Sequence, residues 1–62
     1  MKTKEIIRQL EIEGWVEVRH RGSHRVFKKD GIIELIVLPD HGKNKEPSIG
    51  VLNDIKNKAG WK

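Results

Sequence analysis

The absence of cysteine is the feature that most limits how this chain folds, because the chain has only 62 residues. It therefore has neither a disulfide nor a cysteine-ligated zinc ion to stabilise it. A single core in so short a chain rarely supplies more than ~3–5 kcal/mol of net stability. We expect one small domain over residues 1–62, in which helices and a sheet share one apolar core.

Cysteine usage and the first residues also bear on location. A chain without cysteine suits a reducing cytoplasm. The segment MKTKEIIRQLEIEGW, residues 1–15, carries charges throughout its apolar pattern, unlike a signal peptide or a membrane span. We expect a cytoplasmic protein that does not associate with membranes.

The net charge is +4, and the positive charge is concentrated in one stretch. Between residues 19 and 29 there are five basic residues and two histidines, and no acid. Such a stretch favours an anionic partner, above all nucleic acid. The alternative is a solvated face that only aids solubility. The residues concerned are Arg19, His20, Arg21, His24, Arg25, Lys28 and Lys29.

The first segment has the apolar spacing of a helix over residues 3–13. Thr3 is its predicted N-cap, and Gly14 is expected to end it in a left-handed conformation. Trp15 has two interpretations, a core anchor or a platform for base stacking. Its place directly after a helix favours the core.

Three strand-like segments follow, over residues 15–20, 24–29 and 32–39. Gly22 and Ser23 form the first turn, and the pair Asp30-Gly31 predicts a second hairpin turn. The third segment is almost wholly apolar, so we expect it to be central or covered on both faces, with Pro39 at its end.

The last segment, after a polar loop over residues 40–47, reads as a second helix. Ser48 is its predicted N-cap and Gly60 its predicted end. Its expected buried stripe is Ile49, Leu52, Ile55 and Ala59.

The fold class predicted by this order is α+β, an α-β-β-β-α domain with a three-stranded antiparallel sheet. Packing both helices on one face of the sheet is the simplest way to bury their apolar stripes. The layout is that of a small double-stranded-RNA-binding domain. It leaves the other sheet face and the strand-end loops free to form a site.

His24 is the main candidate for chemistry. Histidine titrates near neutrality and so exchanges protons at cellular pH. RNA cleavage needs such a group to take the proton from a ribose 2′-hydroxyl, and cations to stabilise the charge that develops on the phosphate. The alternative is an inert surface histidine. The residues expected to contact RNA around it are Arg21, Gly22, Ser23, Arg25 and Lys28.

The two other histidines are weaker candidates for a second proton-transfer group. His20 lies in the first strand near the turn, where a solvent-exposed role is expected. His41 follows Asp40, but adjacent residues rarely point the same way, so a dyad is not expected. The spacing of the histidines matches no metal site, and we predict no metal and no cofactor.

The sequence resembles the HicA family of toxins from bacterial toxin–antitoxin pairs. The resemblance is carried by Gly14-Trp15, by RGSHRVFKK at residues 21–29 and by IVLPDHGKNKEPSIGVLNDIKNKAGW at residues 36–61. Its most specific parts are Gly22-Ser23-His24, Pro39 with His41-Gly42, and the final helix after Gly50. It implies the fold described above and an mRNA interferase that cleaves RNA without the ribosome and halts translation. It also implies that His24 is catalytic and that a HicB-type antitoxin covers it.

Two rival functions share this fold and charge. One is a non-catalytic RNA-binding module, in which His24 has no chemical role. The other is a protein-interaction domain whose basic face meets an acidic partner.

Overall fold

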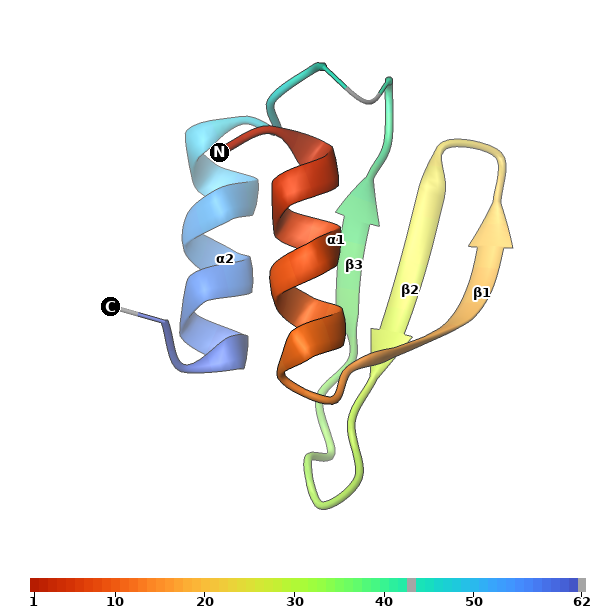
Figure 1. Cartoon of the computed structure of the whole chain (residues 1–62), viewed down its shortest axis with the longest axis vertical. Helices are drawn as coiled ribbons and strands as arrows, with labels where there is room; N and C mark the ends of the chain where they lie inside the picture. Colours follow the sequence, from red (N-terminus) through yellow and green to blue (C-terminus); the bar gives the residue numbers. More distant parts are fainter. Residues whose placement is uncertain (43, 62) are drawn as a thin grey trace.

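A computed structural model describes residues 1–42 and 44–61. The elements are α1 (Thr3–Ile12), β1 (Val16–Arg21), β2 (His24–Lys28), β3 (Ile36–Pro39) and α2 (Ile49–Ala59), as Figure 1 shows. The order α-β-β-β-α confirms the predicted fold class. Lys43, in the predicted loop 40–47, lies outside the described residues. No helix in the described ranges is long and apolar enough to cross a membrane.

The sheet is antiparallel with the strand order β1-β2-β3, so β2 is central. Its inward side chains are Phe27 from β2 and Ile36 and Leu38 from β3, all fully buried. They form one core with Ile6 and Leu10 of α1, Ile55 of α2 and Trp15. Both helices therefore cover the same face of the sheet, as predicted, and α1 lies between α2 and β3 in the view of Figure 1.

Trp15 belongs to this core. Its exposure is only 2%, so the core interpretation is confirmed and a stacking platform is excluded. Gly14 just before it has a φ of +96°, the left-handed conformation expected after the helix.

The start of α1 differs from the prediction. The N-cap is Lys2, whose backbone N–H donates to Glu5 Oε1 at 2.7 Å. Thr3 is the first helical residue and is buried, and its hydroxyl donates to the Lys45 carbonyl at 2.9 Å. The Thr3 side chain is thus used for a tertiary contact instead of a cap.

The third strand is shorter than predicted, and it is an edge strand. Pairing resumes only at Ile36, opposite Phe27, so residues 29–35 form a connection between β2 and β3. Within it Ile33 is 98% exposed. β3 itself buries Ile36 and Leu38 but exposes Val37, so it is covered on one face only and the prediction of a central or doubly covered strand is wrong.

The Asp30-Gly31 turn exists inside that connection. Ile32 N donates to Lys29 O at 3.2 Å, and Gly31 has a φ of +83°. Asp30 has no positive φ, so this is the pattern of a type II turn, not that of the two-residue type I′ hairpin.

The second helix begins and ends as predicted. Val51 N donates to the Ser48 hydroxyl at 3.3 Å, and Gly60 is left-handed with a φ of +76°. The predicted buried stripe is wrong at one position, because Ile49 is 79% exposed. It lies in the first turn, and Val51 packs against the core in its place, while Leu52 and Ala59 pack against the core as predicted.

Candidate active site

The turn between β1 and β2 places His24 at the end of the sheet where β3 also ends (Figure 1). Arg21 pairs with His24 across the two-residue turn formed by Gly22 and Ser23. Gly22 has a φ of +59° and Ser23 has no positive φ, the pattern of a type II′ turn that fits the twist of the strands. On its other side His24 pairs with Pro39.

Strand pairing assigns each site residue to a face, because residues directly opposite one another share a face and successive residues alternate. Arg25 pairs with Leu38, which is buried under the helices, so Arg25 lies on the helix-covered face. His24 therefore lies on the opposite, open face. Arg21 shares that face as the partner of His24.

Lys28 lies on the open face as well, four residues along β2 from His24. This separation is about 14 Å at ~3.4 Å per residue. Arg19 pairs with Val26 on the same face, because Val18 is passed over by a β-bulge between Glu17 and Arg19.

The open face is basic and partly apolar. Its strand residues include no acid, since Glu17, the one acid within the three strands, pairs with Phe27 on the covered face. The side chains at these positions are mostly exposed to solvent. They are Val16, Arg19, Arg21, His24, Val26, Lys28, Val37 and Pro39.

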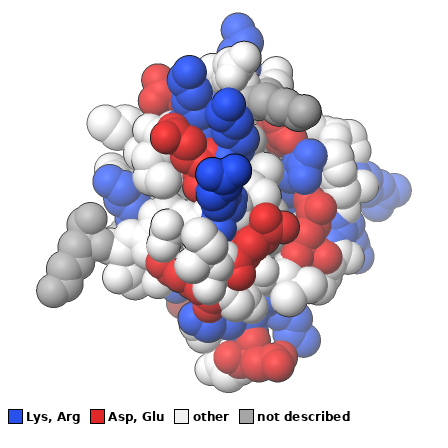
Figure 2. Space-filling model, in the orientation of Figure 1, with Lys and Arg blue, Asp and Glu red and all other residues white. Residues whose placement is uncertain are grey.

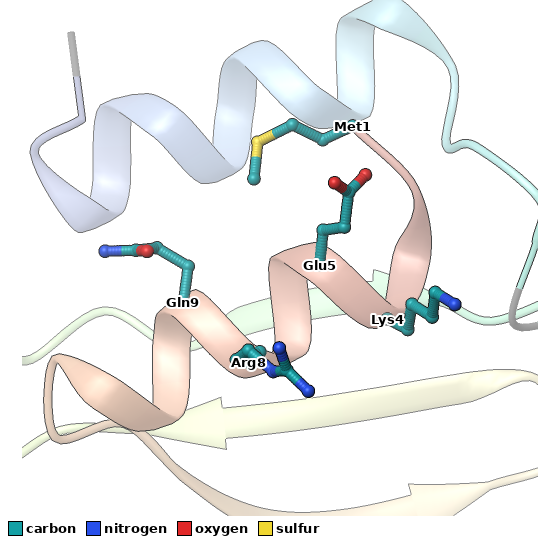
Figure 3. Close-up of a pocket in the computed structure, with 5 residues that line it drawn as sticks. All are labelled: Met1, Lys4, Glu5, Arg8 and Gln9. Atoms are coloured by element: carbon teal, nitrogen blue, oxygen red, sulfur yellow. The ribbon is translucent and has the colours of Figure 1, made fainter.

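The helical side of the molecule has a different charge pattern. Lysine and arginine are intermixed with aspartate and glutamate there, as Figure 2 shows from the α1 side. A polar groove of about 410 Å³ lies on this side and is lined by Met1, Lys4, Glu5, Arg8 and Gln9, all from the N-terminus and α1 (Figure 3). It contains none of the predicted site residues.

Arg25 is engaged by two carboxylates on the covered side of the sheet. Its Nε donates to Asp40 Oδ2 at 2.6 Å, and a terminal nitrogen donates to Glu17 Oε2 at 3.3 Å. The structure thus separates Arg25 from His24, Arg21 and Lys28. A role for Arg25 in binding RNA stays a prediction.

Asp40 connects the site to the loop after β3, a role that sequence reasoning missed. Its N–H donates to the Ser23 carbonyl, and its Oδ1 accepts from Gly42 N at 3.0 Å. The hydrogen bond from the Gly42 amide, with a further contribution from Arg25, lowers the pKa of Asp40 below its ordinary value of 3.8. Successive residues of a strand point to opposite faces, so residues 24 and 25 were expected on different faces. This signal could have indicated that Arg25 needed a partner on the covered side.

The other histidines do not adjoin His24 on the open face. His20 pairs with Arg25 on the covered side. His41 lies in the loop after Asp40, exposed to solvent. Among residues 1–42 and 44–61, no group of three or more histidine or acidic side chains is arranged to hold a metal ion.

These features define a small α+β domain with an exposed histidine on a basic sheet face. The chain belongs to the HicA toxin family: the family model described as HicA toxin of bacterial toxin–antitoxin matches residues 3–61. This confirms the resemblance found in the sequence.

A solved structure described as the HicA3 and HicB3 toxin–antitoxin complex contains a chain similar to this one. The two chains are 32% identical and superpose with a TM-score of 0.80, over 100% of this chain and 97% of the other. Comparison with curated proteins gives no match.

Proposed function

We propose that this toxin is an endoribonuclease that cleaves mRNA and so blocks translation, with His24 as a proton-transfer residue. The observation that carries the proposal is the position of His24 on the open sheet face. It is exposed there beside Arg21, among strand residues that include no acid. Membership of the HicA family supports the same function.

The proposed reaction is an attack by the ribose on its own phosphate. A base takes the proton from the 2′-hydroxyl, the 2′-oxygen attacks phosphorus, and the bond to the 5′-oxygen breaks. The products are a 2′,3′-cyclic phosphate and a 5′-hydroxyl, and the leaving oxygen takes up one proton. His24 serves one of the two proton transfers, a step that contributes about 10²–10⁴-fold when a histidine is well placed.

The basic residues of the open face hold the RNA backbone in this proposal. Arg21 lies across the turn from His24 and is the nearest cation by pairing, so it stabilises the charge that develops on the phosphate. Lys28 binds a second phosphate further along β2. Gly22 and Ser23 keep the turn narrow, and the Ser23 hydroxyl is available to donate to a phosphate oxygen.

The partner proposed for this face is a HicB-type antitoxin. The similar solved chain is described in complex with HicB3. An antitoxin that covers His24 and places acids opposite Arg21 and Lys28 would compete with RNA for the same charges.

The test is incubation of the purified chain with single-stranded RNA in EDTA, followed by analysis of the product ends. The proposal expects fragments ending in 2′,3′-cyclic phosphate, and inhibition when the HicB-type partner is added. Binding of RNA without any cleavage would support the non-catalytic RNA-binding module. Failure to bind RNA at low salt would favour the protein-interaction domain.

A further inference from the structure

Asp40 joins three parts of the molecule that meet beside His24. Its backbone N–H donates to the carbonyl of Ser23, in the turn that leads into His24. Its carboxylate accepts from the Gly42 amide at 3.0 Å and from Arg25 Nε at 2.6 Å. One residue thus links the turn before β2, the loop after β3 and a side chain of β2.

Arg25 keeps the Asp40 carboxylate in place from the covered side of the sheet. Its planar guanidinium directs Nε–H at Asp40, while a separate terminal nitrogen contacts Glu17. The Arg25 side chain is 26% exposed and that of Asp40 is 16% exposed, so water screens the pair only in part.

The far end of the same loop is also anchored. The backbone N–H and the hydroxyl of Thr3 both donate to the Lys45 carbonyl, each at 2.9 Å. The segment that contains His41 and Gly42 is therefore attached at Asp40 to the sheet and at Lys45 to α1.

We propose that the Arg25–Asp40 pair is a positioning element for the active site: it fixes the turn at residues 22–24 against the loop at residues 40–42 without contacting RNA. This inference rests on the proposed ribonuclease function. It assigns Arg25 a role distinct from that of Arg21 and Lys28, which lie on the open face. A shift of about 1 Å in a catalytic group costs on the order of 10²-fold in rate, so such a link matters to turnover.

The test compares two variants that each remove one carboxylate from Arg25. Asp40→Asn removes the acceptor for Arg25 Nε, while its amide oxygen still accepts from Gly42 N. Glu17→Gln removes the other carboxylate, and Glu17 pairs with Phe27 away from the turn, so it is the matched control. We expect kcat for RNA cleavage to fall about 10–100-fold in Asp40→Asn, with KM changed less than about threefold.

Glu17→Gln should keep kcat within about threefold of the wild type. Its loss of thermal stability should be similar to that of Asp40→Asn, because partly exposed ion pairs contribute little. Equal kcat values in the two variants would overturn the proposal. Arg25→Lys, which keeps the charge but loses the planar Nε donor, should also lower kcat. If Asp40→Asn does not fold, a wild-type kcat in Arg25→Lys would overturn the proposal.

A second readout does not depend on cleavage. Amide hydrogen exchange at Asp40, whose N–H is bonded to Ser23, should become at least several-fold faster in Asp40→Asn and stay unchanged in Glu17→Gln. If the wild-type chain fails to cleave RNA, the proposed function is wrong, and this exchange alone decides whether the pair fixes the turn. Unchanged exchange in Asp40→Asn would overturn the positioning role.

Discussion

His24 and Arg25 are neighbours in β2, yet their side chains lie on opposite faces of the sheet. His24 is on the open basic face, and Arg25 is bonded to Asp40 and Glu17 on the side covered by the helices. His24 and Arg25 look equivalent in the sequence, but the structure leads us to predict different roles for them. The two roles can be tested separately.

The open face should carry the salt dependence of RNA binding. Replacing Arg21 and Lys28 together by alanine removes two predicted phosphate contacts. The slope of log K against log salt should then become shallower by about 1.4, at roughly 0.7 per contact for a single strand. The measurement is RNA affinity from fluorescence anisotropy over a range of salt concentrations.

The matched control for that pair is on the other side of the molecule. Lys4 and Arg8 lie on α1 and line the groove in Figure 3. Replacing both by alanine removes the same formal charge but should leave the slope almost unchanged. A larger loss of slope in this control than in the open-face variant would place the RNA on the helical side.

Cleavage should not require a divalent metal, because the proposed proton transfers use side chains. Treating the protein and the RNA with EDTA should leave the initial rate within about twofold of the untreated rate, since histidine acid–base catalysis needs no metal. Loss of activity in EDTA and its recovery on adding a divalent cation would contradict the mechanism.

Gly31→Val should destabilise the fold through the backbone alone. Gly31 has a φ of +83°, and a Cβ added there would meet no atom within 4 Å. The expected cost is about 1–2 kcal/mol, from a left-handed conformation that valine disfavours. In a domain of this size the melting temperature should fall by roughly 4–8 °C per kcal/mol. An unchanged melt would contradict the turn geometry.

Acid should destabilise the fold through two carboxylates. The pKa of Asp40 is lowered as described, and hydrogen bonds from Gln9 and then Trp61 lower the pKa of Glu13 from its ordinary value of 4.5. Because both folded-state values lie below the unfolded ones, the stabilisation is complete above about pH 5 and is lost as the pH falls through the folded values.

Urea unfolding between pH 7 and pH 2.5 measures this loss. In Asp40→Asn and in Glu13→Gln the free energy of unfolding should decline less steeply below pH 5 than in the wild type. A decline as steep in both variants as in the wild type would mean that other groups cause the acid sensitivity.

Local sequence signals predicted the element order and most of the helix ends. Serine at the start of a helix and glycine at its end are common in many proteins, so the capping roles of Ser48 and Gly60 could be predicted without knowing the rest of the fold. The role of Thr3 was predicted wrongly, because its contact with Lys45 joins residues 42 positions apart and only the tertiary fold creates it.

The third strand shows why apolar runs are ambiguous. Residues 32–39 read as one buried strand, but Ile33 and Leu35 are exposed in the connection. Ile36 and Leu38 are fully buried, and Ile32 packs against the core while only partly buried. In the structure, buried and exposed side chains alternate along Ile36–Pro39, with Val37 exposed. The sequence does not indicate this alternation, because the residues on both faces of the strand are apolar.

The candidate site was predictable in part. His24 and its Gly-Ser turn stand out by residue type and by family resemblance. The division between the open-face residues and Arg25 follows from strand parity, a signal that was present in the sequence. The role of Asp40 depends on the register between β2 and β3. These strands are joined by a long connection, so local sequence patterns do not reveal their register.

The most direct test of the account is the initial rate of RNA cleavage in EDTA for His24→Ala, with His20→Ala as the matched control. Both histidines are exposed and lie in the same hairpin, but His20 pairs with Arg25 on the covered side. His24→Ala opens no core cavity, so circular dichroism should show an intact fold. We expect a loss of about 10²-fold or more for His24→Ala and a change within about threefold for His20→Ala. Wild-type cleavage by a folded His24→Ala protein would contradict it.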